Sequence, residues 1–242
     1  MSRSSLAALA LLALLAAPAA YAFELLRTNN NPCARDQQNL FWRGGGVALN
    51  ATRLPERQRV LLEAARLRWN DSLPRFSFAQ SGGAACARDG ITSLELVETP
   101  CGLDQFGAAL AITRSVWNGA GELVDSDVAF NADSYLVTDD AAFLHVALHE
   151  LGHVLGLAHA DACGDSGSGT LMRAVLGNRP FDAPQADDVA GAQAIYGGGG
   201  GGGGVPEGAN SCAVAPPRGV AGGLPLLVGA ALLLALRRRR RD

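Results

Sequence analysis

Three stretches of the chain show the apolar periodicity that predicts helices, residues 54–69, 141–155 and 184–195. In the first, Leu61, Ala65 and Trp69 recur four residues apart and therefore share one face. The second contains good helix formers and no proline, and it stops at Gly156, a residue typical of a helix C-terminus. Two N-cap candidates precede it, Thr138 and Asp139.

Five shorter segments have the alternation or the turn boundaries that predict strands: residues 46–50, 76–80, 93–97, 110–116 and 122–130. In the last of them, Val124, Val128 and Phe130 face one side, and Asp125 and Asp127 face the other. These two acids indicate either an exposed strand face or a calcium site. The helices and strands together predict a single domain over residues 23–196, which is long enough for one hydrophobic core.

Both ends of the chain differ in composition from this central part. Residues 1–22 combine a basic start, an apolar run and the ending Ala20-Tyr21-Ala22, the layout of a secretory signal peptide cleaved after Ala22. Residues 197–219 are rich in glycine and proline and predict a flexible linker. Residues 220–242 join an almost wholly apolar stretch to five arginines. That stretch is just long enough to span a bilayer, with the arginines on the cytoplasmic side.

The C-terminal end resembles the sorting tails of some bacterial surface proteins, the myxobacterial type in particular. Those tails have a cysteine, here Cys212, followed by a short apolar span and a basic end. The resemblance implies that the tail anchors the protein to the membrane or is cut during export. We therefore expect an exported protein, either held at the cell surface of a bacterial envelope or secreted.

The charge of the central part limits the classes of partner. The chain has no lysine, and residues 23–218 contain 14 arginines against 22 acidic residues. An acidic exported domain argues against nucleic acid as a partner. We expect a monomer whose macromolecular partner is a polypeptide substrate.

Cysteines in an exported protein usually form disulfides. Apart from the tail, the chain has four of them, and three pairings are possible. We favour Cys33 with Cys163 and Cys86 with Cys101. Zinc binding by cysteines is the alternative, but the chain has no CxxC pair to support it.

The four histidines of the chain all fall within fifteen residues. Residues four apart lie on one face of a helix, so His149 and His153 point the same way. Gly156 lets the chain turn, so that His159 returns as a third ligand. Three imidazoles leave one position of a tetrahedral ion open, the pattern of a catalytic zinc. Glu150, beside the first ligand, is placed to act as general base in hydrolysis.

The remaining histidine, His145, precedes His149 by one helical turn and lies on the same stripe. We interpret it as a neighbour of the site or a surface residue, not as a ligand. Copper or nickel could also bind three imidazoles in vitro. The alternative to a metal site is that the four histidines are core residues whose hydrogen bonds are all made within the protein. No histidine remains for a serine or cysteine triad.

The pattern HExxHxxGxxH over residues 149–159 is the metzincin signature, and the chain resembles this family of zinc metallopeptidases. The family places a methionine turn beneath the metal, and Met172 in Gly169-Thr170-Leu171-Met172 matches it. The ending Ile195-Tyr196-Gly197 is similar to the matrixin branch (peptidase M10 type). The resemblance covers residues 40–196.

The resemblance implies an α+β fold, a metzincin-like zincin with a twisted, mostly parallel five-stranded sheet and three helices. It implies one catalytic zinc, with calcium possible, and a substrate that extends along an edge strand, for which residues 122–130 are the candidate. Residues 174–181 would line a pocket beyond the methionine turn.

Some features depart from the matrixin pattern. No histidine precedes His145, so the second, structural zinc of matrixins is not expected. The residues before 41 are too few for a prodomain, and Cys33 lacks the sequence of the family's cysteine switch. Asp161, two residues after the third ligand, could support that ligand or cap a turn.

These observations predict a zinc metalloendopeptidase that hydrolyses extracellular proteins with metal-activated water and Glu150 as base. One alternative is a surface binding module that keeps the fold without the activity, and the presence of Glu150 argues against it. A zinc hydrolase of non-peptide amides is the other. An open edge strand favours an extended polypeptide over such a substrate.

Overall fold

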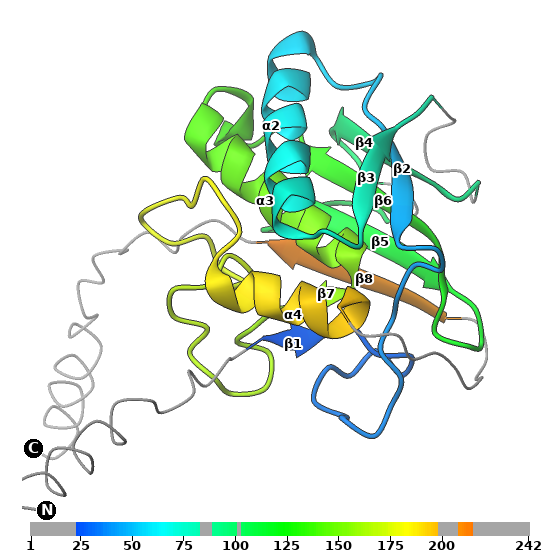
Figure 1. Cartoon of the computed structure of the whole chain (residues 1–242). Helices are drawn as coiled ribbons and strands as arrows, with labels where there is room; N and C mark the ends of the chain where they lie inside the picture. The colour runs from blue at the N-terminus through cyan, green and yellow to red at the C-terminus, as the bar shows by residue number, and fades with distance from the viewer. Residues whose placement is uncertain (1–22, 83–88, 101–102, 198–207, 215–242) are drawn as a thin grey trace, which may run out of the picture.

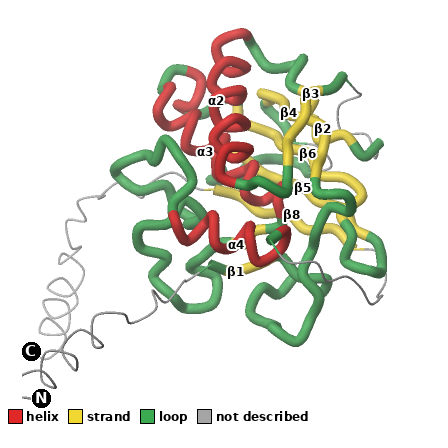
Figure 2. Tube along the Cα trace, viewed as in Figure 1, coloured by secondary structure: helices red, strands yellow, loops and turns green. Residues whose placement is uncertain are grey.

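The computed structural model describes residues 23–82, 89–100, 103–197 and 208–214. One large sheet carries helices α2 (Glu56–Ser72) and α3 (Asp140–Leu155) on the same face, as Figure 1 shows. Helix α4 (Ala186–Tyr196) and a small two-stranded sheet form a separate part next to the last strand of the large sheet (Figure 2), and both contact α3. A short 3-10 helix, η1 (Tyr135–Val137), precedes α3.

The large sheet has the strand order β3-β2-β4-β6-β5-β8, and β1 pairs with β7 in the small one. Strands β3, β2, β4 and β6 run parallel, β5 is antiparallel to β6, and β8 is antiparallel to β5. The predicted five-stranded, mostly parallel sheet with three helices is therefore confirmed, with β8 as a sixth strand. The strands are β1 (Glu24–Leu25), β2 (Gly46–Asn50), β3 (Ser77–Gln80), β4 (Ile91–Val97), β5 (Ala111–Trp117), β6 (Leu123–Asn131), β7 (Leu157–Ala158) and β8 (Gly208–Val214).

The ends of α3 form as the sequence predicts. Asp139 is the N-cap, and its Oδ1 accepts a hydrogen bond of 3.0 Å from the backbone N–H of Ala142. Gly156 ends the helix with φ +103°, a conformation that costs a side-chain-bearing residue free energy. A Cβ at this position would also come within 2.6 Å of the carbonyl oxygen of Leu40. Glycine is therefore required here on both counts.

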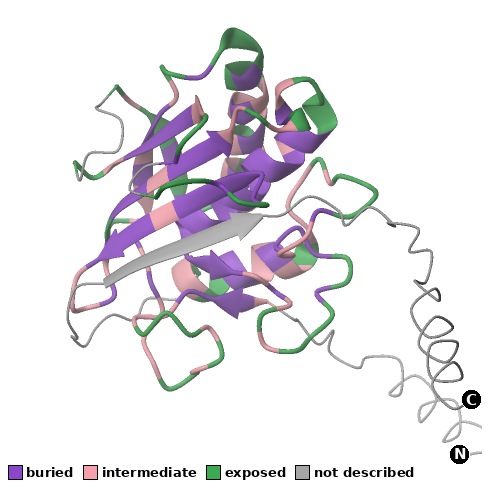
Figure 3. Ribbon diagram, turned by 180° about the vertical axis from the view of Figure 1, so that it is seen from behind, coloured by how far each residue is buried: buried purple, intermediate pink, exposed green. Residues whose placement is uncertain are grey.

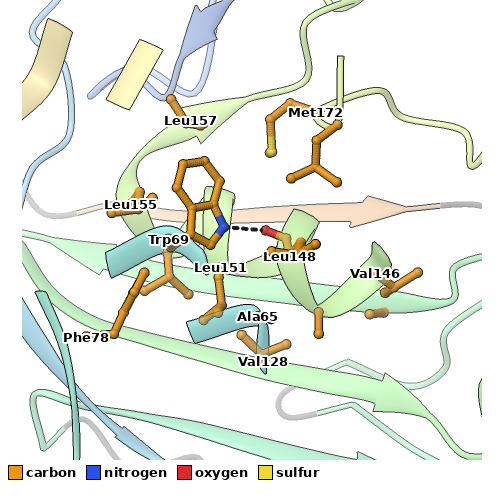
Figure 4. Packing of buried hydrophobic residues seen from close by; sticks show 14 of the residues in the cluster. Ala65, Trp69, Phe78, Val128, Val146, Leu148, Leu151, Leu155, Leu157 and Met172 are labelled. Carbon is orange, nitrogen blue, oxygen red and sulfur yellow. Dashed lines mark hydrogen bonds between the residues drawn. The ribbon is translucent and has the colours of Figure 1, made fainter. Parts of the chain in front are cut away.

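Helix α3 forms the centre of the core and is buried on nearly every side, as Figure 3 shows from behind the sheet. Trp69 of α2 packs against it, and its indole Nε1–H donates to the carbonyl of Leu148 at 2.9 Å (Figure 4). This bond satisfies the polar atom of a side chain that is otherwise wholly buried among apolar neighbours. The α2–α3 pair thereby fixes α3 against the sheet.

Residues 122–130, the candidate edge strand, correspond to β6, which lies inside the sheet between β4 and β5. That prediction was wrong, because the turn before β6 reverses the chain and places the earlier strand β5 further out. Gly121, with φ +74°, makes this reversal. The predicted facing of this strand is also wrong at two positions. Asp125, expected on an exposed face, is only 3% exposed, and Val124, expected on the opposite face, is 40% exposed. A second, small apolar cluster covers that side of the sheet: Phe106, Ala109, Ile112 and Ala129.

The predicted disulfide between Cys33 and Cys163 is present, with the two Cα atoms 5.5 Å apart. The other expected pair, Cys86 with Cys101, lies outside the described residues, as do the signal peptide and the apolar tail. Within the described part of the chain, no helix is both long enough and apolar enough to cross a membrane. Residues 208–214, which were expected to belong to the linker, form β8.

We expect the double variant Cys33→Ser/Cys163→Ser to lose about 2–4 kcal/mol of unfolding free energy. The bridge joins two residues that are 130 positions apart in the sequence, so it restricts the conformations of the unfolded chain. Urea unfolding of both proteins under oxidising conditions measures the difference. Cys212→Ser is the matched control and should leave the midpoint unchanged. A loss below about 0.5 kcal/mol in the double variant would contradict a stabilising role for this bridge.

Candidate metal centre

The structure brings the three predicted ligands together. His149 and His153 lie one turn apart on α3, with ring centroids 4.6 Å from each other. After Gly156, strand β7 pairs with β1 and carries the chain to His159, whose ring centroid lies 5.3 Å from that of His149 and 4.8 Å from that of His153. One nitrogen from each ring lies within 4.8 Å of the other two. One ion can therefore contact all three side chains.

Two backbone carbonyls set which nitrogen of each helical histidine faces the site. His149 Nδ1 lies 2.9 Å from the oxygen of Leu171, and His153 Nδ1 lies 2.8 Å from the oxygen of Leu157. A carbonyl only accepts, so each Nδ1 carries the proton and each Nε2 has the free lone pair. His149 Nε2 is buried with no hydrogen-bond partner among the described residues, and His153 Nε2 lies 3.2 Å from His159 Nε2. The lone pairs thus converge where a metal ion would bind.

Burial also keeps these imidazoles neutral. Burial, with a smaller contribution from the neighbouring imidazoles, lowers the pKa of His153 to about 3 and that of His149 well below its ordinary value. Burial lowers the pKa of His159 as well, although Asp161 opposes the shift. A neutral imidazole is the form that binds a metal. Three neutral nitrogen donors with an orphaned, buried Nε2 suit a zinc ion with one open position.

Glu150 is fully buried beside the first ligand and reaches the sheet. Its Oε2 accepts a hydrogen bond of 2.5 Å from Thr113 Oγ1 on β5, and its Oε1 has no partner among the described residues. Burial raises the pKa of Glu150 to about 8, although the bond from Thr113 opposes this shift. Sequence reasoning missed Thr113, because an inward threonine in a strand carries no signal of its own.

Met172, the predicted methionine turn, is 2% exposed and packs against α3 at Gly152. A Cβ at Gly152 would collide with the sulfur of Met172, so this glycine lets the turn approach the helix. The residue before it, Leu171, supplies the carbonyl that orients His149. The methionine turn therefore supports the site through its backbone as well as its side chain.

Asp188, in the first turn of α4, holds the methionine turn in place. Its carboxylate accepts hydrogen bonds from the backbone N–H groups of Leu171 at 3.0 Å, Met172 at 3.2 Å and Gln185 at 2.8 Å. It is only 1% exposed. Sequence reasoning missed this residue too. The only available signal was an acid in the first turn of a helix, which is common without any such role.

His145 is buried and is not part of the metal-binding group, as predicted. Its Nδ1 accepts a hydrogen bond of 2.8 Å from the N–H of Phe181, and the two rings stack with centroids 5.7 Å apart. Together with residues of the segment 174–181, it lines a cavity of about 100 Å³ next to the methionine turn. Asp161 fixes the start of that segment by accepting from the N–H of Ala174 at 3.1 Å.

Among the residues that the structure describes, the three histidines are the only group of potential ligands close enough to hold an ion. Asp125 and Asp127 belong to no such group. Calcium binding at these acids therefore has no support in the structure.

A centre of three histidines, with a glutamate beside the first ligand and a methionine turn behind it, defines a metal-dependent hydrolase. Comparison with protein families agrees with this class, because the model of the matrixin family, peptidase M10, matches residues 61–197, more than half of the chain. The chain belongs to the matrixin family and is a metallopeptidase, and zinc is the metal that this family implies. No curated protein matches the sequence.

We expect Asp188→Ala to lose about 2–3 kcal/mol of unfolding free energy, since three backbone N–H groups, two of them buried, lose their acceptor. Zinc affinity should fall about tenfold or more, because Leu171 would no longer hold His149 firmly. Urea unfolding and competition with a chromophoric chelator measure the two effects. Asp182→Ala, which removes an exposed acid six residues earlier, is the matched control. Unchanged zinc affinity in Asp188→Ala would contradict the link between this carboxylate and the ligand.

Proposed function

We propose that the protein is a zinc endopeptidase that cuts extended polypeptides, with Glu150 as the general base. The observation that carries this proposal is the buried carboxylate of Glu150. Thr113 holds one of its oxygens, and the other has no partner among the described residues. A glutamate kept in this state beside a set of metal ligands suits a reaction that needs a proton acceptor. A purely structural metal site has no such need.

The residues divide the chemistry between them. The Nε2 atoms of His149, His153 and His159 would hold the zinc, which when bound lowers the pKa of a water molecule and polarises a substrate carbonyl. Glu150 Oε1 accepts the proton of the attacking water and returns it to the leaving amine. Thr113 keeps the other oxygen in place, so the free oxygen does not have to reorient between the two transfers.

Strand β5 supports a polypeptide as the substrate. It is the outermost of the five predicted strands, and it carries Thr113, so its edge runs beside the general base. An extended peptide could pair with this edge through backbone hydrogen bonds if it takes the place of β8. The small cavity at His145 would then accept one substrate side chain. These features favour an endopeptidase over a hydrolase of small amides, and retention of Glu150 favours an enzyme over a binding module.

The setting that we propose is extracellular. The Cys33–Cys163 disulfide supports an oxidising compartment, in keeping with the signal peptide and sorting tail expected from the sequence. The substrates would then be extracellular proteins, cut by a monomeric enzyme at the cell surface or after its release.

We expect Glu150→Gln to keep about one zinc per chain and to lose peptide cleavage by about 10²–10⁴-fold, because the amide cannot accept the proton. Elemental analysis gives the metal content, and a mixed library of quenched fluorescent peptides gives the rate. His153→Ala is the contrasting variant and should lose zinc and cleavage together. Cleavage by Glu150→Gln at the wild-type rate would refute the proposed base.

We expect Thr113→Val to lower kcat about tenfold with little change in KM, since it removes the hydrogen bond that positions Glu150 without removing a metal ligand. Thr113→Ser keeps the hydroxyl and should retain most of the rate. Steady-state kinetics on one peptide from the library measures both constants. A raised KM with unchanged kcat would instead assign Thr113 to substrate binding.

A further inference from the structure

The sixth strand of the large sheet comes from the C-terminal part of the chain. Strand β8 pairs antiparallel with β5 along its whole length, with Gly208 opposite Trp117 and Val214 opposite Ala111. Figure 1 shows it in orange, between the rest of the sheet and the small part that contains β7 and α4. The edge of β5 is therefore already paired with another segment of the same chain.

The register of this pairing places β8 beside the strand residue that holds the proposed general base. Cys212 is the residue opposite Thr113, whose hydroxyl holds Glu150. Strand β8 also lies close to α3, the helix that carries two of the three metal ligands. The tail backbone thus runs at the level of the general base, along the edge that a polypeptide substrate would need.

One row of backbone groups can pair with only one strand at a time. The outward N–H and C=O groups of β5 that would bind an extended substrate are those that form the ladder with β8. Prolines bracket the paired segment, with Pro206 two residues before it and Pro216 two residues after it. Because proline has no N–H, it limits strand pairing to the part between them.

We propose that residues 208–214 occupy the substrate edge of β5 within the same molecule and hold the peptidase inhibited until they are displaced or cut away. This inference rests on the proposed function, in which polypeptides bind along β5. The segment follows the folded part after residues 198–207 only, so its effective concentration at the edge is of the order of millimolar. A strand contact that would be weak between separate molecules is therefore sufficient within one chain.

The first experiment uses the full chain with a recognition sequence for a specific protease placed in the glycine run at residues 197–204. The protein folds with its tail attached, and cutting followed by dilution then releases the tail. Peptide cleavage is measured before and after the cut. Hydrogen exchange of the β5 amides is measured on the same protein carrying Glu150→Gln, which prevents self-cleavage.

We expect cutting and dilution to raise the cleavage rate about tenfold or more, and to speed exchange of the β5 amides by a similar factor. A synthetic peptide of residues 208–214 should then inhibit the cut enzyme competitively. Before the cut, the specific rate should not depend on enzyme concentration, since the inhibitory contact is intramolecular. A rate that changes with concentration would mean that the edge is covered by a second copy and would overturn the proposal.

Two further outcomes separate this inference from the function on which it rests. Equal cleavage rates before and after the cut, in a zinc-loaded and active enzyme, would overturn inhibition by the tail and leave the peptidase intact. Absence of cleavage in both forms despite bound zinc would refute the proposed function, and the inhibitory role with it.

A variant of the uncut chain tests the same strand without a protease. The variant is Ser211→Pro/Cys212→Pro. In the wild-type strand, the N–H groups of two adjacent residues point to opposite sides, so one of the two substitutions removes a donor from the ladder with β5. We expect about the same rise in rate as after cutting. Gly202→Pro/Gly203→Pro, outside the paired segment, is the matched control and should not raise the rate. Equal rates in the two variants would overturn the role of β8.

Discussion

The site depends on two hydrogen bonds from imidazole to backbone. The carbonyls of Leu171 and Leu157 each accept the Nδ1 proton of a helical histidine, and this leaves both Nε2 atoms free and fixed in direction. Without these acceptors, the two rings could rotate or change tautomer inside the core. Three lone pairs could then no longer converge on one point. Each acceptor belongs to a segment that follows α3 in the chain, so the metal centre forms only when those segments have packed beneath the helix.

This requirement explains why residues far from the signature contribute to the site. Asp188 is 39 positions after His149, yet it holds the turn that contains Leu171. Thr113 precedes the helix and belongs to the sheet, yet it sets the position of the Glu150 carboxylate. A motif in one helix supplies the reactive groups, and the surrounding fold supplies their directions. Buried polar groups of this kind stabilise a single arrangement only when each one has its partner.

The sequence predicted much of this fold and site, and the parts that it missed have physical reasons. Helix α3, its two ends and the grouping of His149, His153 and His159 follow from local periodicity and glycine placement, which act over a few residues. The order of the strands is a long-range property, so residues 122–130 were assigned to the edge when they lie inside the sheet. Thr113 and Asp188 were missed for the same reason, because their roles arise from contacts between distant segments. The strand at residues 208–214 was not predicted, because it lies in a glycine- and proline-rich stretch whose composition is typical of linkers.

At the C-terminal end of α3, distant segments of the fold supply hydrogen-bond donors to the last carbonyls of the helix. The last carbonyls of a helix have no partner within the helix, and here they lie next to two buried ligands. Trp42 Nε1–H donates to the carbonyl of Val154 at 2.8 Å, and the Tyr196 hydroxyl donates to that of Leu155 at 2.8 Å. The N–H of Leu26 donates to the carbonyl of Gly156 at 2.8 Å. These donors come from the start and the end of the domain, so the helix end that carries the metal ligands is fixed only when both have docked. The ending around Tyr196 therefore has a structural purpose, because it closes the core directly beside the chemistry.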